Sequence, residues 1–120
     1  MKAYKRNRSG EKKSDYIKVL DDVIVVESFF ERLFGLMLRP KLERGQGLLI
    51  PGCNSIHTMW MKYPIDVIFL DKQIRIVEMI DCLKPFKFSK IIKKSDSVLE
   101  LPGKSITAYD LKVDDMLRFF

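Results

Sequence analysis

Two neighbouring runs of β-branched and apolar residues constrain the fold of this chain most. The first run is Ile65–Leu70, the second covers residues 74–80, and the polar residues 71–73 separate them. Runs of this length joined by a short polar turn are typical of an antiparallel β-hairpin. Arg75 and Glu78 break strict alternation in the second run, which indicates a β-bulge or mixed burial. The centre of the chain therefore predicts a sheet.

Further short apolar runs extend this prediction on both sides of the hairpin. Residues 23–26, 48–50 and 98–101 each have the composition of a strand, and Pro-Gly dipeptides end the second and third of them. Residues 116–120 close the chain as another strand, and residues 105–110 predict a single helical turn. Most of these elements are separated by short polar turns.

One segment has the pattern of a longer helix. Ser28 and Glu31 form a capping box, in which the Ser side chain caps the helix start and the Glu follows three residues later. Apolar residues then recur at helical spacing, namely Phe30, Leu33, Phe34, Met37 and Leu38. Pro40 disfavours helix at the residue before it. The pattern predicts a helix over residues 29–38.

The length of 120 residues favours a single domain, since domains usually hold about 100–200 residues. A chain of this size buries roughly two-thirds of its unfolded surface, which is enough for a core without disulfides or a metal. Strands outnumber helices in the prediction. The sequence therefore predicts a compact α+β domain over residues 19–120, with a mainly antiparallel, partly closed β-sheet and one main α-helix.

Residues 1–18 are predicted to form a flexible basic N-terminal arm. They carry seven Lys or Arg against Glu11 and Asp15, whereas residues 19–120 carry 15 basic and 14 acidic residues. The net charge of +6 thus divides into +5 and +1. A nearly neutral domain gives little reason to expect nucleic-acid binding. A solvated tail is favoured over one that is attracted to nucleic acid or to an anionic membrane.

The first residues do not resemble a secretory signal, because no stretch of about 7–15 apolar residues follows the basic start. No apolar run reaches the roughly 18–20 residues of a transmembrane helix. We therefore expect a cytoplasmic protein, in which Cys53 and Cys82 are free thiols. Nothing in the sequence indicates an oligomeric state.

Three blocks of residues, in order, resemble a known family. They read R-L-F-G-L-M-L-R at 32–39, H-T-M-W-M-K at 57–62 followed by I-D-V-I-F-L-D at 65–71, and V-L-E-L-P-G at 98–103. Over residues 20–120 the chain resembles domain of unknown function family 192, also called uncharacterised protein family 0127. The resemblance implies a small prokaryotic domain of mixed sheet and helix, and it implies no accepted activity.

Known catalytic signatures are missing from the sequence. It contains no phosphate-binding glycine loop, no His-Glu-x-x-His helix and no serine elbow. Their absence argues against nucleotide-driven, metalloprotease and hydrolase functions.

Four residues form the candidate ligand-binding site: His57, Trp60, Lys62 and Asp66. Alternation places Trp60 and Lys62 on one face, where they could stack on a planar group or pair with an acidic ligand. An ordinary strand with a half-buried Trp and an exposed Lys explains the pair equally well. The leading hypothesis is a non-enzymatic module that binds a small ligand or a protein, and nucleic acid is not expected as a partner.

Two carboxylates interrupt apolar runs. Exposure is the default for Asp66, and burial would require partners such as the nearby backbone, Lys62 or Thr58. Glu100 has the same two interpretations. A pair of carboxylates for acid–base catalysis would need both groups in one cleft.

The alternative hypothesis is a thiol-dependent enzyme or redox protein that uses Cys53 and His57. The only His lies four residues after this Cys, so a turn could pair them and activate a thiolate. Zinc could use the same residues with Cys82 and with Asp66 or Asp81, but the spacing matches no zinc motif. A buried thiol beside a structural His is favoured. We therefore predict no catalytic residue, no metal and no cofactor.

A third hypothesis is a basic adaptor that docks on nucleic acid or a membrane surface. Residues 84–94 combine five Lys with Phe86 and Phe88, a combination that could cover a single strand by stacking and phosphate contacts. A solvated loop whose two Phe side chains anchor on the core is favoured.

Overall fold

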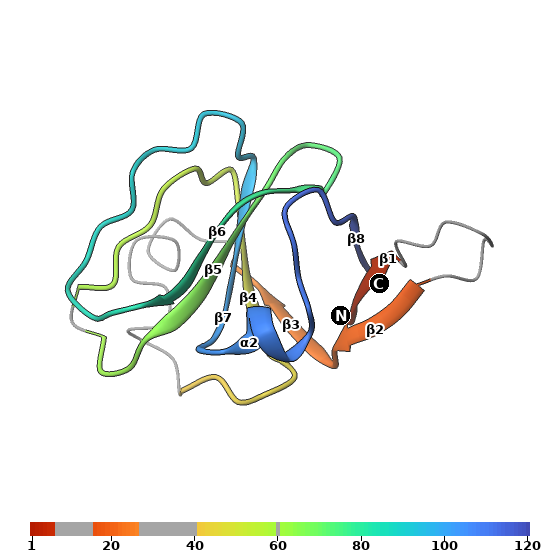
Figure 1. The fold of residues 1–120 in the computed structure, drawn as a ribbon, viewed down its shortest axis with the longest axis horizontal. Coiled ribbons are helices and arrows are strands. Elements are labelled where there is room, and N and C mark those ends of the chain that lie inside the picture. The colour runs from red at the N-terminus through yellow and green to blue at the C-terminus, as the bar shows by residue number, and fades with distance from the viewer. Residues whose placement is uncertain (7–15, 27–40, 60) are drawn as a thin grey trace.

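The structure is a computed structural model that describes residues 1–6, 16–26, 41–59 and 61–120. Strands dominate these ranges (Figure 1), and one short helix accompanies them. In chain order, the elements are β1 (Ala3–Arg6), β2 (Tyr16–Leu20), β3 (Asp22–Val25), β4 (Gln46–Pro51), β5 (Ile65–Leu70), β6 (Ile76–Leu83), β7 (Ser97–Pro102), α2 (Ser105–Ala108) and β8 (Leu117–Phe119).

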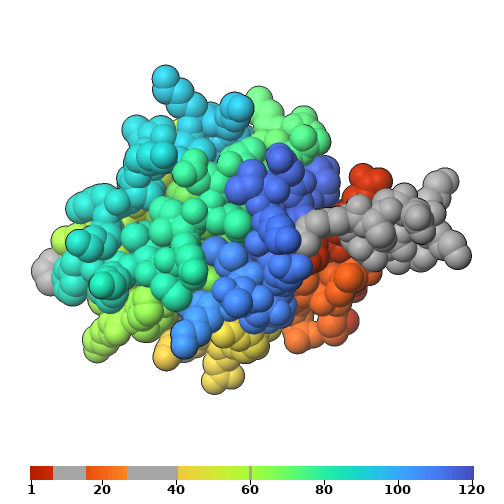
Figure 2. Space-filling view, viewed as in Figure 1, coloured from red at the N-terminus to blue at the C-terminus, as the bar shows by residue number. Residues whose placement is uncertain are grey.

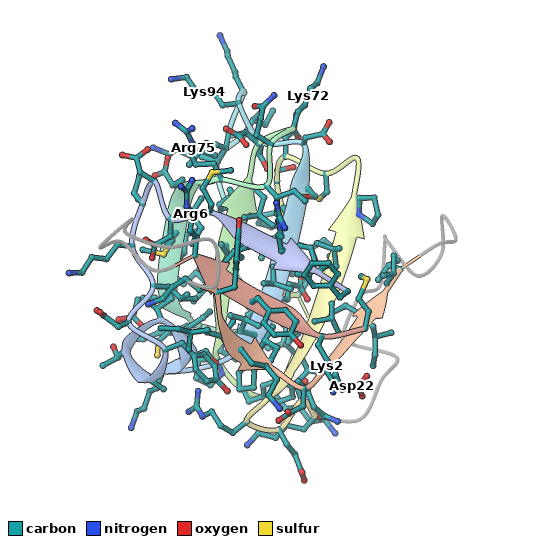
Figure 3. The ribbon with its side chains drawn as sticks, turned by 90° about the vertical axis from the view of Figure 1, so that its right-hand side faces the viewer. Lys2, Arg6, Asp22, Lys72, Arg75 and Lys94 are labelled. Carbon is teal, nitrogen blue, oxygen red and sulfur yellow. The ribbon has the colours of Figure 1, made fainter. Side chains whose placement is uncertain are left out.

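The strands form two sheets. The larger sheet has the order β3-β4-β7-β5-β6, and the smaller one has the order β2-β1-β8. Strands β3 and β4 pair in parallel, and the other pairs are antiparallel. The predicted hairpin is present as β5 and β6, and its register shifts near both ends. Figure 3 shows the smaller sheet crossing in front of the larger one.

Strand β5 lies between β7 and β6 in the larger sheet, and all six of its residues are buried. Because side chains alternate along a strand, Ile65, Val67 and Phe69 pack into one core, whereas Ile68 and Leu70 pack into another. The first core also holds Leu42, Ile56, Met61 and Val98. The second core lies between the two sheets and holds Ala3, Leu20, Leu99, Leu101 and Leu117.

The strand predictions are confirmed at residues 23–25, 48–50, 65–70, 98–101 and 117–119. The fold class is confirmed only in part. The helix predicted over residues 29–38 lies outside the described residues. Within the described residues, the only helix is the four-residue α2. The expected partly closed sheet also differs from what is found, because the described strands form two separate sheets and close no barrel.

The N-terminal residues differ from the flexible arm expected over residues 1–18. Strand β1 pairs with both β2 and β8, and Ala3 is fully buried. Lys5 is also buried, and its Nζ donates hydrogen bonds to the carbonyls of Tyr109 at 3.1 Å and Asp110 at 3.0 Å. A Lys side chain can bury its stem when its ammonium group is satisfied in this way, so charge density alone misled the prediction. Residues 7–15 of the expected arm lie outside the described residues.

Among the described residues, no helix has the length and apolar character that crossing a membrane requires.

Candidate functional site

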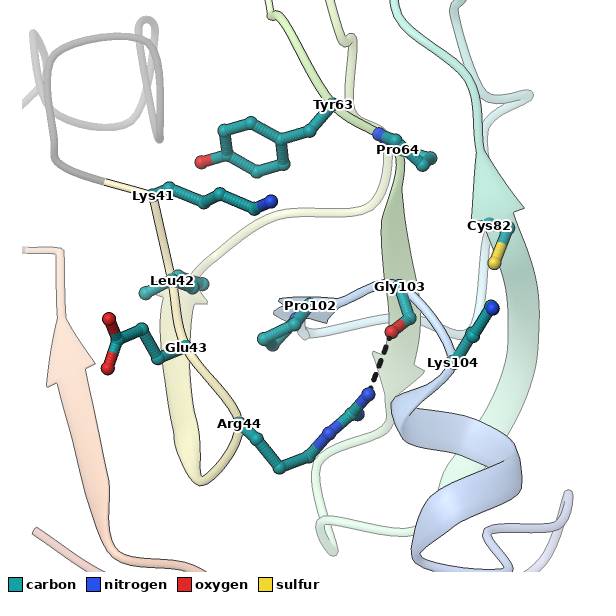
Figure 4. A pocket seen from close by; sticks show the side chains of 10 residues that line it. All are labelled: Lys41, Leu42, Glu43, Arg44, Tyr63, Pro64, Cys82, Pro102, Gly103 and Lys104. Atoms are coloured by element: carbon teal, nitrogen blue, oxygen red, sulfur yellow. Dashed lines mark hydrogen bonds between the residues drawn. The ribbon is translucent and has the colours of Figure 1, made fainter.

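A cavity of about 520 Å³ lies at one end of the strands of the larger sheet, where β4 and β5 begin and β6 and β7 end (Figure 4). Four chain segments meet there: residues 41–44, residues 63–64, Cys82 and residues 102–104. Antiparallel pairing brings these strand ends together although they are far apart in the sequence. The cavity is therefore a product of the sheet topology.

Three cationic side chains line the cavity: Lys41, Arg44 and Lys104. Glu43 is the one acidic residue among the described residues of the lining, and Figure 4 shows its carboxylate pointing away from the other side chains. Arg44 is held in place, because its Nη1 donates to Ser105 Oγ at 2.8 Å and its Nη2 donates to the Gly103 carbonyl at 3.2 Å. The guanidinium keeps further N–H donors beyond these two bonds.

Apolar surface supplies the rest of the wall. Leu42 is buried, and Tyr63, Pro64 and Pro102 lie beside it around the cavity. The Nζ of Lys41 lies 5.4 Å from the centroid of the Tyr63 ring, at the distance of a cation–π contact. The cavity thus combines an apolar wall with positively charged groups.

Asp66 positions this site from within the protein. Its carboxylate is fully buried, and Oδ1 accepts the backbone N–H groups of Cys82 at 2.8 Å and Lys104 at 3.2 Å. Oδ2 accepts the N–H of Ile106 at 2.7 Å. Cys82 and Lys104 both have positive φ, of 49° and 72°, which is unfavourable for residues with a side chain. The three hydrogen bonds stabilise these conformations and so fix two residues that line the cavity.

The thiol of Cys82 is neutral in this setting. Burial raises its pKa, and the neighbouring carboxylates of Asp81 and Asp66 raise it further. Ligand atoms of these three residues lie within 4.8 Å of one another, but a metal would compete with the N–H groups that Asp66 already accepts. The arrangement does not favour a thiolate nucleophile.

Glu100 lies in strand β7, with Leu48 and Val67 as its register partners on either side. Burial raises the pKa of its carboxyl to about 8. Its Oε2 has no hydrogen-bond partner within the described part of the chain. Alternation places Glu100 on the face of the first core and Asp66 on the opposite face. The two carboxylates therefore do not share one cleft for acid–base catalysis.

Two of the other predicted site residues, His57 and Lys62, lie between β4 and β5. His57 forms an isolated β-bridge with Phe88, and its Nδ1 accepts the N–H of Met59 at 3.3 Å. Lys62 is exposed, and Trp60 lies outside the described residues. Alternation along β5 places Asp66 on the face of the second core, where its carboxylate accepts backbone N–H groups. The grouping of His57, Trp60, Lys62 and Asp66 in one ligand site stays a prediction.

The contacts of Cys53 are those of a structural thiol and not of a nucleophile. It is half-buried against the first core, and its Sγ donates to the Ser55 carbonyl at 2.9 Å. This bond stabilises the protonated thiol, which is the opposite of what a nucleophile requires.

Sequence reasoning missed the cationic residues of the cavity. Lys41, Arg44 and Lys104 each lie within a few residues of a Pro or Gly that marks a turn. Cations at the turns between strands are a usable signal, because loops at one edge of a sheet often carry the functional residues. The strand order that brings these turns together could not be read from the sequence.

Comparison with curated proteins finds a relative in sequence. A curated relative, the UPF0127 protein of Thermococcus sibiricus (strain DSM 12597 / MM 739), is 29% identical over 97 residues. The match covers 78% of this chain and 62% of the relative, so the chain spans about three-fifths of that protein's length.

Two crystal structures share the fold. One is a protein of unknown function from Novosphingobium aromaticivorans DSM 12444, with a TM-score of 0.77 and 17% identity over 99% of this chain and 84% of the other. The other is a candidate transcription regulator from Sinorhizobium meliloti 1021, with a TM-score of 0.76 and 20% identity over 98% of this chain and 91% of the other. At these identities the likeness concerns the fold alone.

The family profile described as "DUF192: Uncharacterized ACR" matches residues 10–119. This match covers nearly the whole chain and confirms the resemblance carried by the three sequence blocks. The chain belongs to the DUF192 family.

Proposed function

We propose that the protein is a non-enzymatic binding module whose cavity takes a small organic anion with a flat or apolar body. The observation that carries this proposal is the cavity of about 520 Å³, in which Lys41, Arg44 and Lys104 surround an apolar wall. Ligand sites are typically concave and mainly apolar, with a few polar groups that fix the orientation of the ligand.

The charges of the cavity favour an anion over a neutral or cationic ligand. Arg44 is anchored to Ser105 and Gly103, so its guanidinium is already oriented before a ligand arrives. A preorganised guanidinium loses less entropy when it binds a carboxylate or phosphate. Lys41 and Lys104 add charges that are less constrained.

A binding role is favoured over thiol catalysis by the state of both thiols. Cys53 donates its hydrogen to a carbonyl, and burial raises the pKa of Cys82. Either Cys would need a thiolate to act as a nucleophile. In this proposal Asp66 does not contact the ligand, although the sequence led us to expect that contact. Its carboxylate instead holds the backbone of Cys82 and Lys104, which line the cavity.

Binding of 2-naphthoate, measured by chemical-shift perturbation, tests the proposal. We expect 2-naphthoate to shift signals of residues around the cavity, and we expect the uncharged 2-naphthamide to bind at least about tenfold more weakly. The double variant Lys41→Gln/Lys104→Gln should weaken 2-naphthoate binding by a similar factor.

Lys62→Gln is the matched control, because Lys62 is exposed, lies close to this region in the sequence and does not line the cavity. It should leave the affinity unchanged. Equal affinity for the acid and the amide would contradict the proposal. Loss of binding in Lys62→Gln alone would instead place the ligand at the site expected from the sequence.

A further inference from the structure

Residues 84–94, here called the lysine ribbon, expose several large apolar side chains. The exposed fraction is 52% for Phe86, 73% for Phe88 and 67% for Ile91. The expectation that the two Phe side chains anchor on the core is therefore wrong. Single exposed apolar residues are common, but three within six positions of one segment indicate an interaction surface.

The backbone of the lysine ribbon is fixed by the fully buried Thr58. The Thr58 Oγ1 donates to the Lys84 carbonyl at 2.6 Å and accepts the Lys87 N–H at 2.9 Å. The main chain of Thr58 donates to the Lys87 carbonyl and accepts the N–H of Phe86, both at 2.8 Å. Two more backbone bonds continue the pairing, from Ser89 N–H to the Ile56 carbonyl and from Ile92 N–H to the Asn54 carbonyl. The apolar side chains are thus presented by an ordered scaffold.

The charge of the lysine ribbon is strongly positive. It holds five Lys and no acidic residue. One of the five, Lys90, has its Nζ 3.6 Å from Oε1 of the half-buried Glu78, and Asp81 and Asp96 lie just outside the segment. Most of the positive charge is therefore available to a partner.

The ribbon lies on the outside of the molecule, at the end away from the two termini (Figure 1). Figure 2 shows its side chains along the outer edge of the space-filling surface. None of its residues lines the cavity described above. A protruding edge suits a partner that can deform around it better than a partner that needs a groove.

We infer that the lysine ribbon docks the protein on an anionic lipid surface, as a peripheral contact. Phe88 and Ile91 would enter the boundary between headgroups and acyl chains, while the Lys side chains stay at the level of the anionic headgroups. Lipid is favoured over single-stranded nucleic acid because Ile91 has no aromatic face for stacking on a base.

Co-sedimentation with vesicles tests this inference. The intact protein should bind phosphatidylcholine vesicles that contain roughly 30 mol% phosphatidylserine, and it should bind pure phosphatidylcholine weakly. Phe88→Ser/Ile91→Ser should weaken binding at least about tenfold by removing the inserted groups. Lys87→Gln/Lys93→Gln should weaken it about 10–30-fold at about 0.1 M salt.

Matched controls lie at the opposite end of the molecule. Ile17→Ser/Phe120→Ser removes an exposed Ile and an exposed Phe, and Lys2→Gln/Arg6→Gln removes two exposed cations. Both should bind the vesicles as the intact protein does. Unchanged binding by Phe88→Ser/Ile91→Ser, or no vesicle binding by the intact protein, would overturn the inference. So would tighter binding to an oligothymidylate of about 16 nucleotides that the ribbon variants abolish.

Discussion

Glu100 places a carboxyl group inside strand β7, where water cannot solvate its charge. It is only 4% exposed, and burial raises its pKa from 4.5 to about 8. The group is therefore protonated in the folded protein at neutral pH, whereas the same group in the unfolded chain is ionised. This difference links the stability of the fold to pH.

We predict that stability falls as pH rises between about 5 and 8. In this interval the folded state keeps a proton on Glu100 that the unfolded state has lost, so the slope is roughly −1.4 kcal/mol per pH unit. Glu100→Gln stays neutral and should remove this slope, as urea unfolding across the pH range would measure. A slope that is the same in both proteins would show that Glu100 titrates normally.

Asp66→Asn tests the positioning role of the buried carboxylate. Asn cannot accept the N–H groups of Cys82, Lys104 and Ile106 together, because its amide nitrogen faces one of them as a second donor. We expect a loss of about 2–4 kcal/mol in the free energy of unfolding. Asp71→Asn, in an exposed turn, is the control and should cost less. A change below about 0.5 kcal/mol for Asp66→Asn would contradict the role.

At the scale of elements, the strands were predictable and the pairing of loops was not. The run Ile65–Leu70 is apolar enough to identify a strand in the interior of a sheet, and only Asp66 interrupts it. The burial of Asp66 depends on N–H groups that follow it by 16 to 40 positions, which no local pattern reveals. The same holds for Thr58, whose partners lie 26 to 29 residues later.

We predict that Thr58→Val loosens the lysine ribbon. Val keeps the shape of Thr but removes the hydroxyl that bonds to the Lys84 carbonyl and the Lys87 N–H, so both partly buried bonds are lost. The free energy of unfolding should fall by about 1–3 kcal/mol, and the amide of Lys87 should exchange hydrogen faster. Thr58→Ser keeps the hydroxyl and should restore slow exchange. Equal exchange in the Val and Ser variants would show that the hydroxyl does not hold the ribbon.

At the scale of the whole molecule, the two sheets depend on each other through the second core. Strand β1 supplies Ala3 to this core and is the middle strand of the smaller sheet. The strand and the residue before it contain two Lys and one Arg, so local charge concealed the place of β1 in the fold. The cavity was equally hidden, because its lining comes from four separated segments whose proximity is a property of the whole topology.

We predict that deleting residues 1–6 destabilises the entire domain. The deletion leaves β2 and β8 without their common partner and uncovers Leu20 and Leu117, which are 1% and 2% exposed in the intact protein. It also removes the hydrogen bonds that Lys5 Nζ donates to the carbonyls of Tyr109 and Asp110, which follow α2. The free energy of unfolding should fall by about 3 kcal/mol or more, measured by thermal and urea unfolding. Lys2→Gln/Arg6→Gln removes charge while keeping the strand, and it should change stability by less than about 0.5 kcal/mol. A truncated protein that melts within about 2 °C of the intact one would mean that β1 contributes nothing to the fold.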